Sequence, residues 1–207
     1  MARPLRLSSD QILSAAERVF ARRGYADTSL RQLMAAARVS TTAFYARFAS
    51  KEAVLVALVD RLLGELYRAM GAVLVEVKSR EEAVERGADA VVATLSGHER
   101  LVALVLGEGL SSASVRAGLA RAYRALAELL AAQLAGATQA AGEPLADAGS
   151  LAWAFVGAVQ LQIARWAVFQ EIDRDQLSAA MRQVAHTLLP AVAAPSSGGR
   201  RRRPRKR

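Results

Sequence analysis

The chain has 207 residues, no cysteine, and a hydrophobic content of 53% of which little is aromatic. This length fits one large domain or two small ones with a buried core, and the lack of cysteine excludes disulfides and thiolate metal sites. The N-terminus has no apolar run, and the uncharged run 148–164 contains Ser and Gln. Neither a secretory signal nor a membrane span is therefore predicted, and we expect a cytoplasmic protein.

The net charge of +9 is unevenly distributed along the chain. Residues 1–51 hold nine Arg and Lys against three Asp and Glu, residues 52–199 hold twelve against sixteen, and residues 200–207 add seven cations. A basic N-terminal segment followed by an acidic middle segment is typical of a protein with an N-terminal nucleic-acid-binding domain. RNA-binding and membrane-surface proteins also have basic ends, so charge alone does not decide.

The first predicted helix covers about residues 8–23. Apolar residues recur at helical spacing within it, namely Ile12, Ala16, Val19 and Phe20. Arg22, Arg23 and Gly24 form a stop signal, because cations favour the last turn of a helix and Gly favours the position after it.

Residues 28–51 predict a helix-turn-helix. The first of its helices has one apolar face, formed by Leu30, Leu33, Met34 and Ala37. Thr28 is expected to cap this helix, Ser40 to cap the second, whose inner face is Phe44 and Phe48, and Ser50 to cap the next. In such a motif the second helix enters the major groove of DNA and its N-terminal residues reach base edges.

Short motifs inside this segment are more specific than the spacing. They are Gly24-Tyr25, Thr28-Ser29, Ala37-Arg38-Val39-Ser40, Phe44-Tyr45, Phe48 and Ser50-Lys51-Glu52. Over about residues 10–60 the chain resembles the DNA-binding domain of the TetR family of transcriptional regulators, and downstream it matches only that family's helical outline. Arg38 stands where the family usually has Gly. A left-handed residue other than Gly costs about 1–2 kcal/mol, so either the turn is made differently or packing offsets the strain.

The candidate DNA-binding residues surround the second helix of the motif. They are Thr28, Arg38, Ser40, Thr41, Thr42, Ala43, Tyr45 and Lys51. Exposed hydroxyls at such a helix can bond phosphates and base edges. The resemblance implies phosphate contacts by Thr28, Thr42, Tyr45 and Lys51. The alternative is a polar surface on a structural hairpin, and Arg31 and Arg47 are equally compatible with phosphate contact and simple solvation.

Six further helices are expected, at about 51–77, 80–95, 99–106, 114–134, 146–170 and 174–189. Loops are expected at Gly136 and at residues 142–144, and Asp173 is expected to cap the last helix. The helix at 51–77 begins beside the helix-turn-helix and extends beyond it. It is therefore a candidate lever between an effector site and DNA, although a merely structural connecting helix fits equally well.

Aromatic and amide side chains indicate a small-molecule pocket between these helices. The candidate ligand-binding residues are Tyr67, Met70, Leu104, Tyr123, Phe155, Gln162, Trp166 and Phe169. For any one of them, core packing or a dimer interface is the favoured explanation, since aromatic residues are enriched there too.

Nothing in the sequence favours catalysis, a cofactor or a metal. His98 and His186 are the two histidines, and neither lies near a second histidine or carboxylate at ligand spacing. No nucleophile is flanked by a base, so we do not expect an enzyme.

We therefore expect an all-α regulator of about nine helices, with a helix-turn-helix head at 1–50, a helical effector-binding and dimerisation domain at 51–195 and a disordered basic tail at 196–207. The resemblance implies a homodimer that binds a palindromic operator in double-stranded DNA and represses until a small-molecule effector releases it. The alternatives are a ligand-independent DNA-binding protein, or a helical carrier or enzyme that borrows the hairpin.

Overall fold

The computed structural model describes residues 5–140 and 147–189, and every regular element in these ranges is helical. In chain order they are α1 (Leu5–Arg23), α2 (Leu30–Ala37), α3 (Thr41–Tyr45), α4 (Lys51–Glu76), α5 (Arg80–Ser96), α6 (Glu99–Gly107), the short 3₁₀ helix η1 (Gly109–Ser111), α7 (Ala113–Ala140), α8 (Ala148–Ala167) and α9 (Arg174–Leu188). The predicted all-α class with about nine helices is confirmed for this part of the chain.

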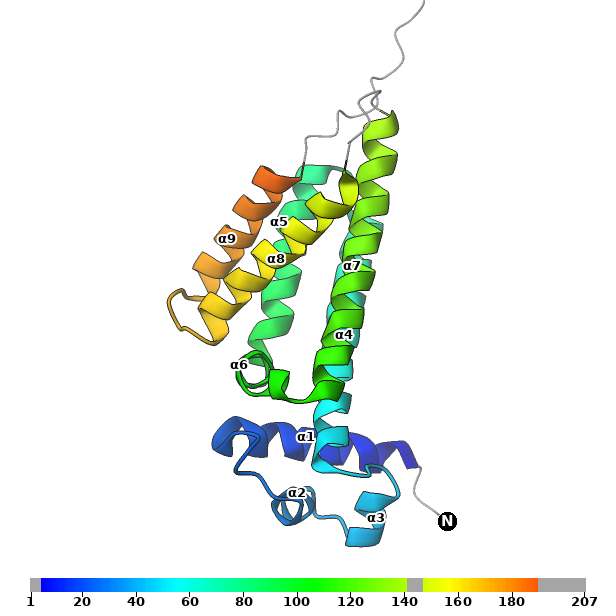
Figure 1. The fold of residues 1–207 in the computed structure, drawn as a ribbon, viewed down its shortest axis with the longest axis vertical. Coiled ribbons are helices and arrows are strands. Elements are labelled where there is room, and N and C mark those ends of the chain that lie inside the picture. Colours follow the sequence, from blue (N-terminus) through cyan, green and yellow to red (C-terminus); the bar gives the residue numbers. More distant parts are fainter. Residues whose placement is uncertain (1–4, 141–146, 190–207) are drawn as a thin grey trace, which may run out of the picture.

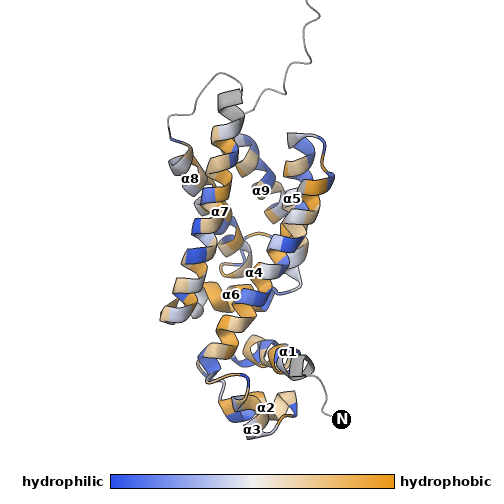
Figure 2. Ribbon diagram, turned by 90° about the vertical axis from the view of Figure 1, so that its right-hand side faces the viewer, coloured by the Kyte–Doolittle hydropathy of each residue, from blue (hydrophilic) through white to orange (hydrophobic). Residues whose placement is uncertain are grey.

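The helices form an elongated molecule (Figure 1). Helices α1 to α3 make a small unit at one end, which we call the head, and α5 to α9 make the larger unit, which we call the body. Helix α4 begins in the head and continues into the body, and α6 lies at the end of the body that faces α1. Figure 2 shows hydrophobic residues along α4 where it passes from one unit to the other.

The head and the body share one continuous hydrophobic core. Phe20, Leu33 and Phe44, from α1, α2 and α3, are at most 2% exposed and belong to the same cluster as Leu58 of α4 and Trp166 of α8. Helix α1 therefore packs across the helix-turn-helix. The division into domains at residue 50 stays a prediction, because nothing in this core separates the two units.

Side-chain caps fix several helix starts where the sequence places them. The Ser40, Ser50 and Asp173 side chains accept hydrogen bonds from backbone N–H groups three residues on, as predicted. The predicted cap at Thr28 is wrong. Ser29 caps α2 instead, in a reciprocal capping box with Gln32, so the helix begins one residue later than Thr28 would have set it.

Three predicted boundaries differ from the structure. Helix α1 begins at Leu5 rather than at residue 8. Helix α7 continues through Gly136 to Ala140, because one Gly among good helix formers costs only about 1 kcal/mol. Helix α8 ends at Ala167 rather than at residue 170, where Gln170 has a positive φ of 55°. The predicted loop at 142–144 and the predicted tail at 196–207 lie outside the described residues.

No single helix in the described ranges is long and apolar enough to span a membrane. One consecutive pair, Glu81–Ser96 and Glu99–Ser111, has sufficient length and hydropathy when taken together, but it is bent by 84°. Both members of the pair contribute buried residues, among them Val92, Leu95 and Leu101, to the common core.

Candidate nucleic-acid interface

Helix α3 presents one anchored face and one exposed face. Ser40 precedes it in an extended conformation, and its Oγ accepts a hydrogen bond from the Ala43 N–H at 3.2 Å. Phe44 is fully buried, and Phe44 and Phe48 pack as a tilted ring pair with centroids 6.1 Å apart. Tyr45, next to Phe44, is 52% exposed. The two phenylalanines therefore fix the helix on the head and leave its polar face in solvent.

The turn before α3 is left-handed at Arg38, which has φ 53° and ψ 43°. The Arg38 N–H donates to the Ala35 carbonyl, and the Val39 N–H donates to the Met34 carbonyl. These two bonds form a Schellman motif, in which Gly is the preferred left-handed residue. The turn is thus made in the usual way without Gly, and Met34 and Val39, both packed against the core, hold it there.

Five of the predicted DNA-binding residues lie together on the exposed surface at the end of the head. They are Arg38, Ser40, Thr41, Thr42 and Tyr45. Ala43 is half-buried among them. This surface offers hydroxyl groups and one guanidinium, which are groups that bond phosphate oxygens and base edges. Figure 1 shows it at the end of the molecule opposite α9.

Thr28 and Lys51 lie elsewhere and are already bonded. Thr28 is 2% exposed, and its Oγ1 donates to the Gly24 carbonyl at 2.7 Å, so its side chain does not face solvent. Lys51 Nζ donates to the Tyr25 carbonyl at 2.7 Å and to the Ala26 carbonyl at 3.2 Å. It also lies 4.3 Å from the centre of the Tyr25 ring. Lys51 therefore closes the α1–α2 turn in addition to any contact with phosphate.

A second set of contacts ties the same turn to the body. The Glu108 carboxylate, which follows α6, accepts hydrogen bonds from the Tyr25 and Ala26 N–H groups at 3.1 and 3.2 Å. Glu52 of α4 accepts a hydrogen bond from the Ser112 hydroxyl at 2.6 Å. Bonds from Ser112 and Ser114 lower the pKa of Glu52. We call the Glu108 and Glu52 bonds the clasp. The sequence did not indicate the clasp, because its partners lie up to 83 residues apart.

His98 has carboxylate partners that the sequence did not indicate. It lies between Glu17 of α1 and Glu65 of α4. Glu17 also pairs with Arg61 of α4. The partners are 81 and 33 residues from His98 along the chain, so no local spacing indicated them.

The eight predicted ligand-binding residues differ widely in exposure, and their role in binding stays a prediction. Leu104 and Trp166 are buried in the common core, at 6% and 4% exposed. Phe169 lies past the end of α8 and is 58% exposed, and Tyr67 is 49% exposed. Of the remainder, Met70, Phe155 and Gln162 are half-buried. The prediction for Phe169 assumed that α8 continues to residue 170, and the earlier end of the helix removes it from that face.

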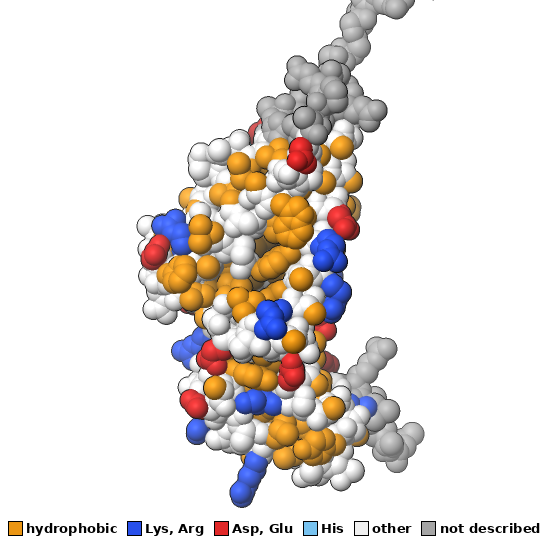
Figure 3. Space-filling model, in the orientation of Figure 1, with side chains coloured by type: hydrophobic (Ala, Val, Ile, Leu, Met, Phe, Trp, Pro, Cys, Tyr) orange, Lys and Arg blue, Asp and Glu red, His pale blue; other side chains and the backbone are white. Residues whose placement is uncertain are grey.

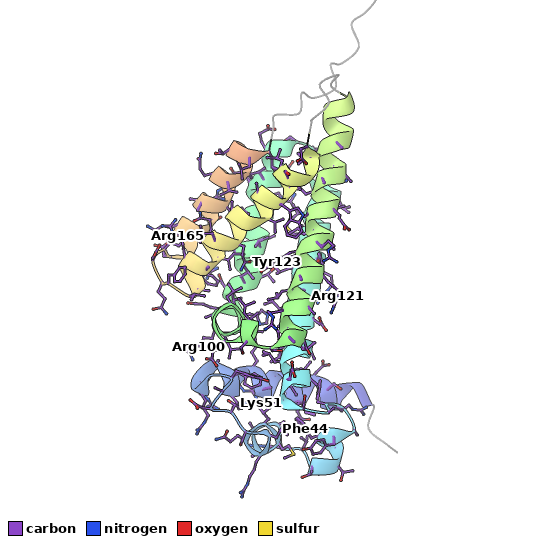
Figure 4. The ribbon with its side chains drawn as sticks, viewed as in Figure 1. Phe44, Lys51, Arg100, Arg121, Tyr123 and Arg165 are labelled. Carbon is purple, nitrogen blue, oxygen red and sulfur yellow. The ribbon has the colours of Figure 1, made fainter. Side chains whose placement is uncertain are left out.

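Tyr123 is the predicted residue with the clearest polar role in the body. It lies between α7 and α8 (Figure 4), and its hydroxyl donates to Gln160 Oε1 at 2.6 Å. Burial raises the pKa of Tyr123 to about 12, so the phenol stays protonated at neutral pH. Figure 3 shows a hollow in this face of the body, with hydrophobic side chains inside it and cationic side chains on the surrounding surface. Hydrophobic walls with few polar groups are typical of small-molecule sites.

The head has the arrangement of a helix-turn-helix, with α2 and α3 joined by a tight turn. Residues 12–58 match the family model of the bacterial regulatory proteins of the TetR family. This match covers the head and the start of α4. No curated protein matches the chain.

Solved structures share the fold over almost the whole chain. The fatty acid degradation regulator FadR from Bacillus halodurans has a TM-score of 0.73 and 21% identity, over 93% of this chain and 98% of that one. FadR from Bacillus subtilis in complex with stearoyl-CoA has a TM-score of 0.72 and 20% identity, over 87% and 97%. A TetR-like regulator from Rhodococcus sp. RHA1 has a TM-score of 0.69 and 24% identity, over 89% and 97%.

Proposed function

We propose that the protein is a repressor that binds an inverted-repeat operator as a homodimer and leaves it when a small molecule binds the body. The observation that carries DNA binding is the exposed surface of Arg38, Ser40, Thr41, Thr42 and Tyr45, on α3 and the turn before it, which the buried Phe44 anchors to the head. Such a rigid, exposed helix at the end of a basic head suits the major groove. Base reading is assigned to residues 41–43 and Arg38, and phosphate contact to Thr42, Tyr45 and Lys51.

The exposed side of α8 supports a dimer. Trp153 and Leu161 are 50% and 54% exposed, and Gly157 between them has open space around it. Residues four apart share one helix face, so these three positions form a stripe that the described part of the chain leaves exposed. A two-fold dimer through α8 and α9 would cover this stripe and place two heads to read two half-sites.

The hollow in the body (Figure 3) and the polar pair of Tyr123 and Gln160 between α7 and α8 support a small-molecule effector. A ligand there lies against α7 and α8, and α6 and α4 connect the body to the head. The clasp formed by Glu108 and Glu52 bonds the segment after α6 to the α1–α2 turn and to α4. A ligand-induced shift of the body would therefore act directly on that turn. Coupling of 1–3 kcal/mol would change operator affinity by about 5–150-fold. Because one structural neighbour holds stearoyl-CoA, that molecule is the first probe.

The test begins with the DNA upstream of the protein's own coding sequence. Footprinting on this DNA and selection from a randomised duplex library should converge on one inverted repeat. Stearoyl-CoA and other apolar candidates are then added to the complex. A protein with no preference among duplexes would contradict the proposal, and a specific complex that no small molecule weakens would favour a ligand-independent regulator.

A further inference from the structure

The His98 cluster lies where the head meets the body. His98 is the residue before α6, and its Nδ1 is 2.5 Å from Oε1 of Glu17 on α1. Its Nε2 is 2.9 Å from Oε2 of Glu65 on α4, and Arg61 of α4 pairs with the other oxygen of Glu17. These four side chains join α1 to α4 and to the start of α6, and we define them as the His98 cluster.

The geometry favours a doubly protonated imidazole, because both ring nitrogens face ionisable carboxyl groups. A carboxylate accepts hydrogen bonds and does not donate them, so each ring nitrogen facing one must carry a proton. With the imidazolium present, the cluster contains two positive and two negative charges. A neutral imidazole leaves one nitrogen lone pair facing a carboxylate, and that contact becomes repulsive. The two nitrogens face different carboxylates, so the donors do not converge on one point as metal ligands do.

The surroundings of His98 favour this charged state. Burial, the largest influence, lowers its pKa, but the hydrogen bonds and charges of Glu17 and Glu65 together outweigh burial and leave the pKa of His98 raised above its ordinary value. These carboxylates are the charged groups that act on the imidazole from the helices packed around it, and the adjacent Glu99 and Arg100 are exposed. A raised pKa in the folded state means that the contacts are complete at low pH and are lost as the pH rises through it.

We propose that the His98 cluster is a proton-operated latch that fixes the position of the head on the body. Its protonated form ties α1 to α4 and α6, and loss of the proton releases one of the two carboxylates. Phe20, Leu33 and Phe44 pack α1, α2 and α3 against one another within the common core, so a shift of α1 is passed on to the recognition helix. The latch therefore makes the placement of the DNA-reading surface depend on pH, independently of any ligand in the body.

The absence of native cysteine allows a direct test. Spin labels are attached to Arg31→Cys on α2 and Glu128→Cys on α7, both exposed positions, and the labelled chain is diluted with unlabelled chain. We expect a narrow distribution of label distances at pH 6 and a broader or displaced one at pH 9. His98→Gln should give the pH 9 distribution at both values. His186→Gln is the matched control, since His186 lies on α9 and should leave the response unchanged.

A second variant tests the proposal independently, in case His98→Gln does not fold. Glu65→Gln removes one negative charge from the cluster, so the change in distance should occur at a lower pH than in the unmodified chain. Distances that do not change with pH, or a pH response that survives in His98→Gln, would overturn the proposal. Because the measurement contains no DNA, this outcome is distinct from failure to find an operator. With an operator in hand, affinity should fall about fivefold from pH 6 to pH 9 in the unmodified chain and stay constant in His98→Gln.

Discussion

Arg38 holds a left-handed conformation that costs an L-residue about 1–2 kcal/mol, and the structure shows no change of turn that avoids this cost. Arg38→Gly should therefore raise the free energy of unfolding by about 1 kcal/mol. Part of this gain is offset, because Gly increases the entropy of the unfolded chain. Urea unfolding measures the difference. Arg38→Lys, which has the same strain, is the control and should leave the stability unchanged.

The same pair of variants tests Arg38 as a DNA contact. If its guanidinium reaches a base edge, Arg38→Gly should weaken operator binding by about tenfold or more while stabilising the fold. Arg38→Lys keeps the charge and should lose less. Equal operator affinity in all three proteins would show that Arg38 serves the turn alone.

Lys51 combines a structural role with a proposed phosphate contact. Lys51→Ala removes two bonds to the Tyr25 and Ala26 carbonyls, so the free energy of unfolding should fall by about 1 kcal/mol. If Lys51 also contacts phosphate, binding to all duplexes should weaken similarly and the salt slope should decrease by about 1. Lys78→Ala, at an exposed position after α4, is the matched control. An unchanged salt slope would show that Lys51 acts only in the α1–α2 turn and does not contact phosphate.

At the scale of elements, Glu108, between α6 and η1, bonds the body directly to the α1–α2 turn. Glu108→Ala removes the acceptor for two backbone N–H groups and should lower the free energy of unfolding by about 1–2 kcal/mol. Glu128→Ala, at an exposed position on α7, should have no such effect. Thermal unfolding of both variants decides this. Equal stability would mean that water replaces Glu108 without cost.

Local chemistry explains which helix boundaries were predictable. Ser40, Ser50 and Asp173 act through residues three positions away, and a short window of sequence contains that information. Thr28 and Ser29 are both capping residues, and the choice between them depends on the reciprocal bond from Gln32 and on the burial of Thr28. The end of α8 was likewise missed, because the left-handed Gln170 carries no sequence signal.

The site was predictable only where it is local. The exposed residues of α3 follow from helical periodicity and one family motif, whereas the His98 cluster and the Glu108 clasp depend on contacts between distant segments. The pocket residues were predicted from residue type alone. Residue type does not show that Leu104 and Trp166 are buried in the core. Periodicity shows which face a side chain occupies, but it does not show which neighbouring helix covers that face.

At the scale of the whole molecule, the proposed dimer can be tested with two leucines of equal exposure. Leu161 on α8 and Leu129 on α7 are both 54% exposed. Leu161→Glu should place two charges in the proposed interface and shift the protein to monomer, whereas Leu129→Glu should remain dimeric. Sedimentation at micromolar concentration measures both. A monomeric unmodified chain, with and without DNA, would contradict the proposed assembly.

The C-terminal sequence separates general affinity for nucleic acid from the reading of an operator. Seven cations within residues 200–207 add charge close to the magnitude carried by the head segment, but they follow no recognition motif. Such a block neutralises phosphates without reading bases, so its contribution should depend on salt and not on sequence. A chain ending at Gly199 should therefore lose affinity for operator and random duplex by similar factors, and the salt slope of both should decrease.

Paired salt titrations of the full chain and the shortened chain on both duplexes measure this effect. A chain in which residues 200–207 are kept in scrambled order is the control, because it preserves the charge and removes any sequence-specific arrangement. It should bind as the full chain does, since base reading belongs to Arg38 and residues 41–43. A tenfold greater loss on the operator than on random duplex would assign sequence or shape recognition to the C-terminal segment. If binding to both duplexes is unchanged, the charge of residues 200–207 serves contact with another polyanion or with a protein partner.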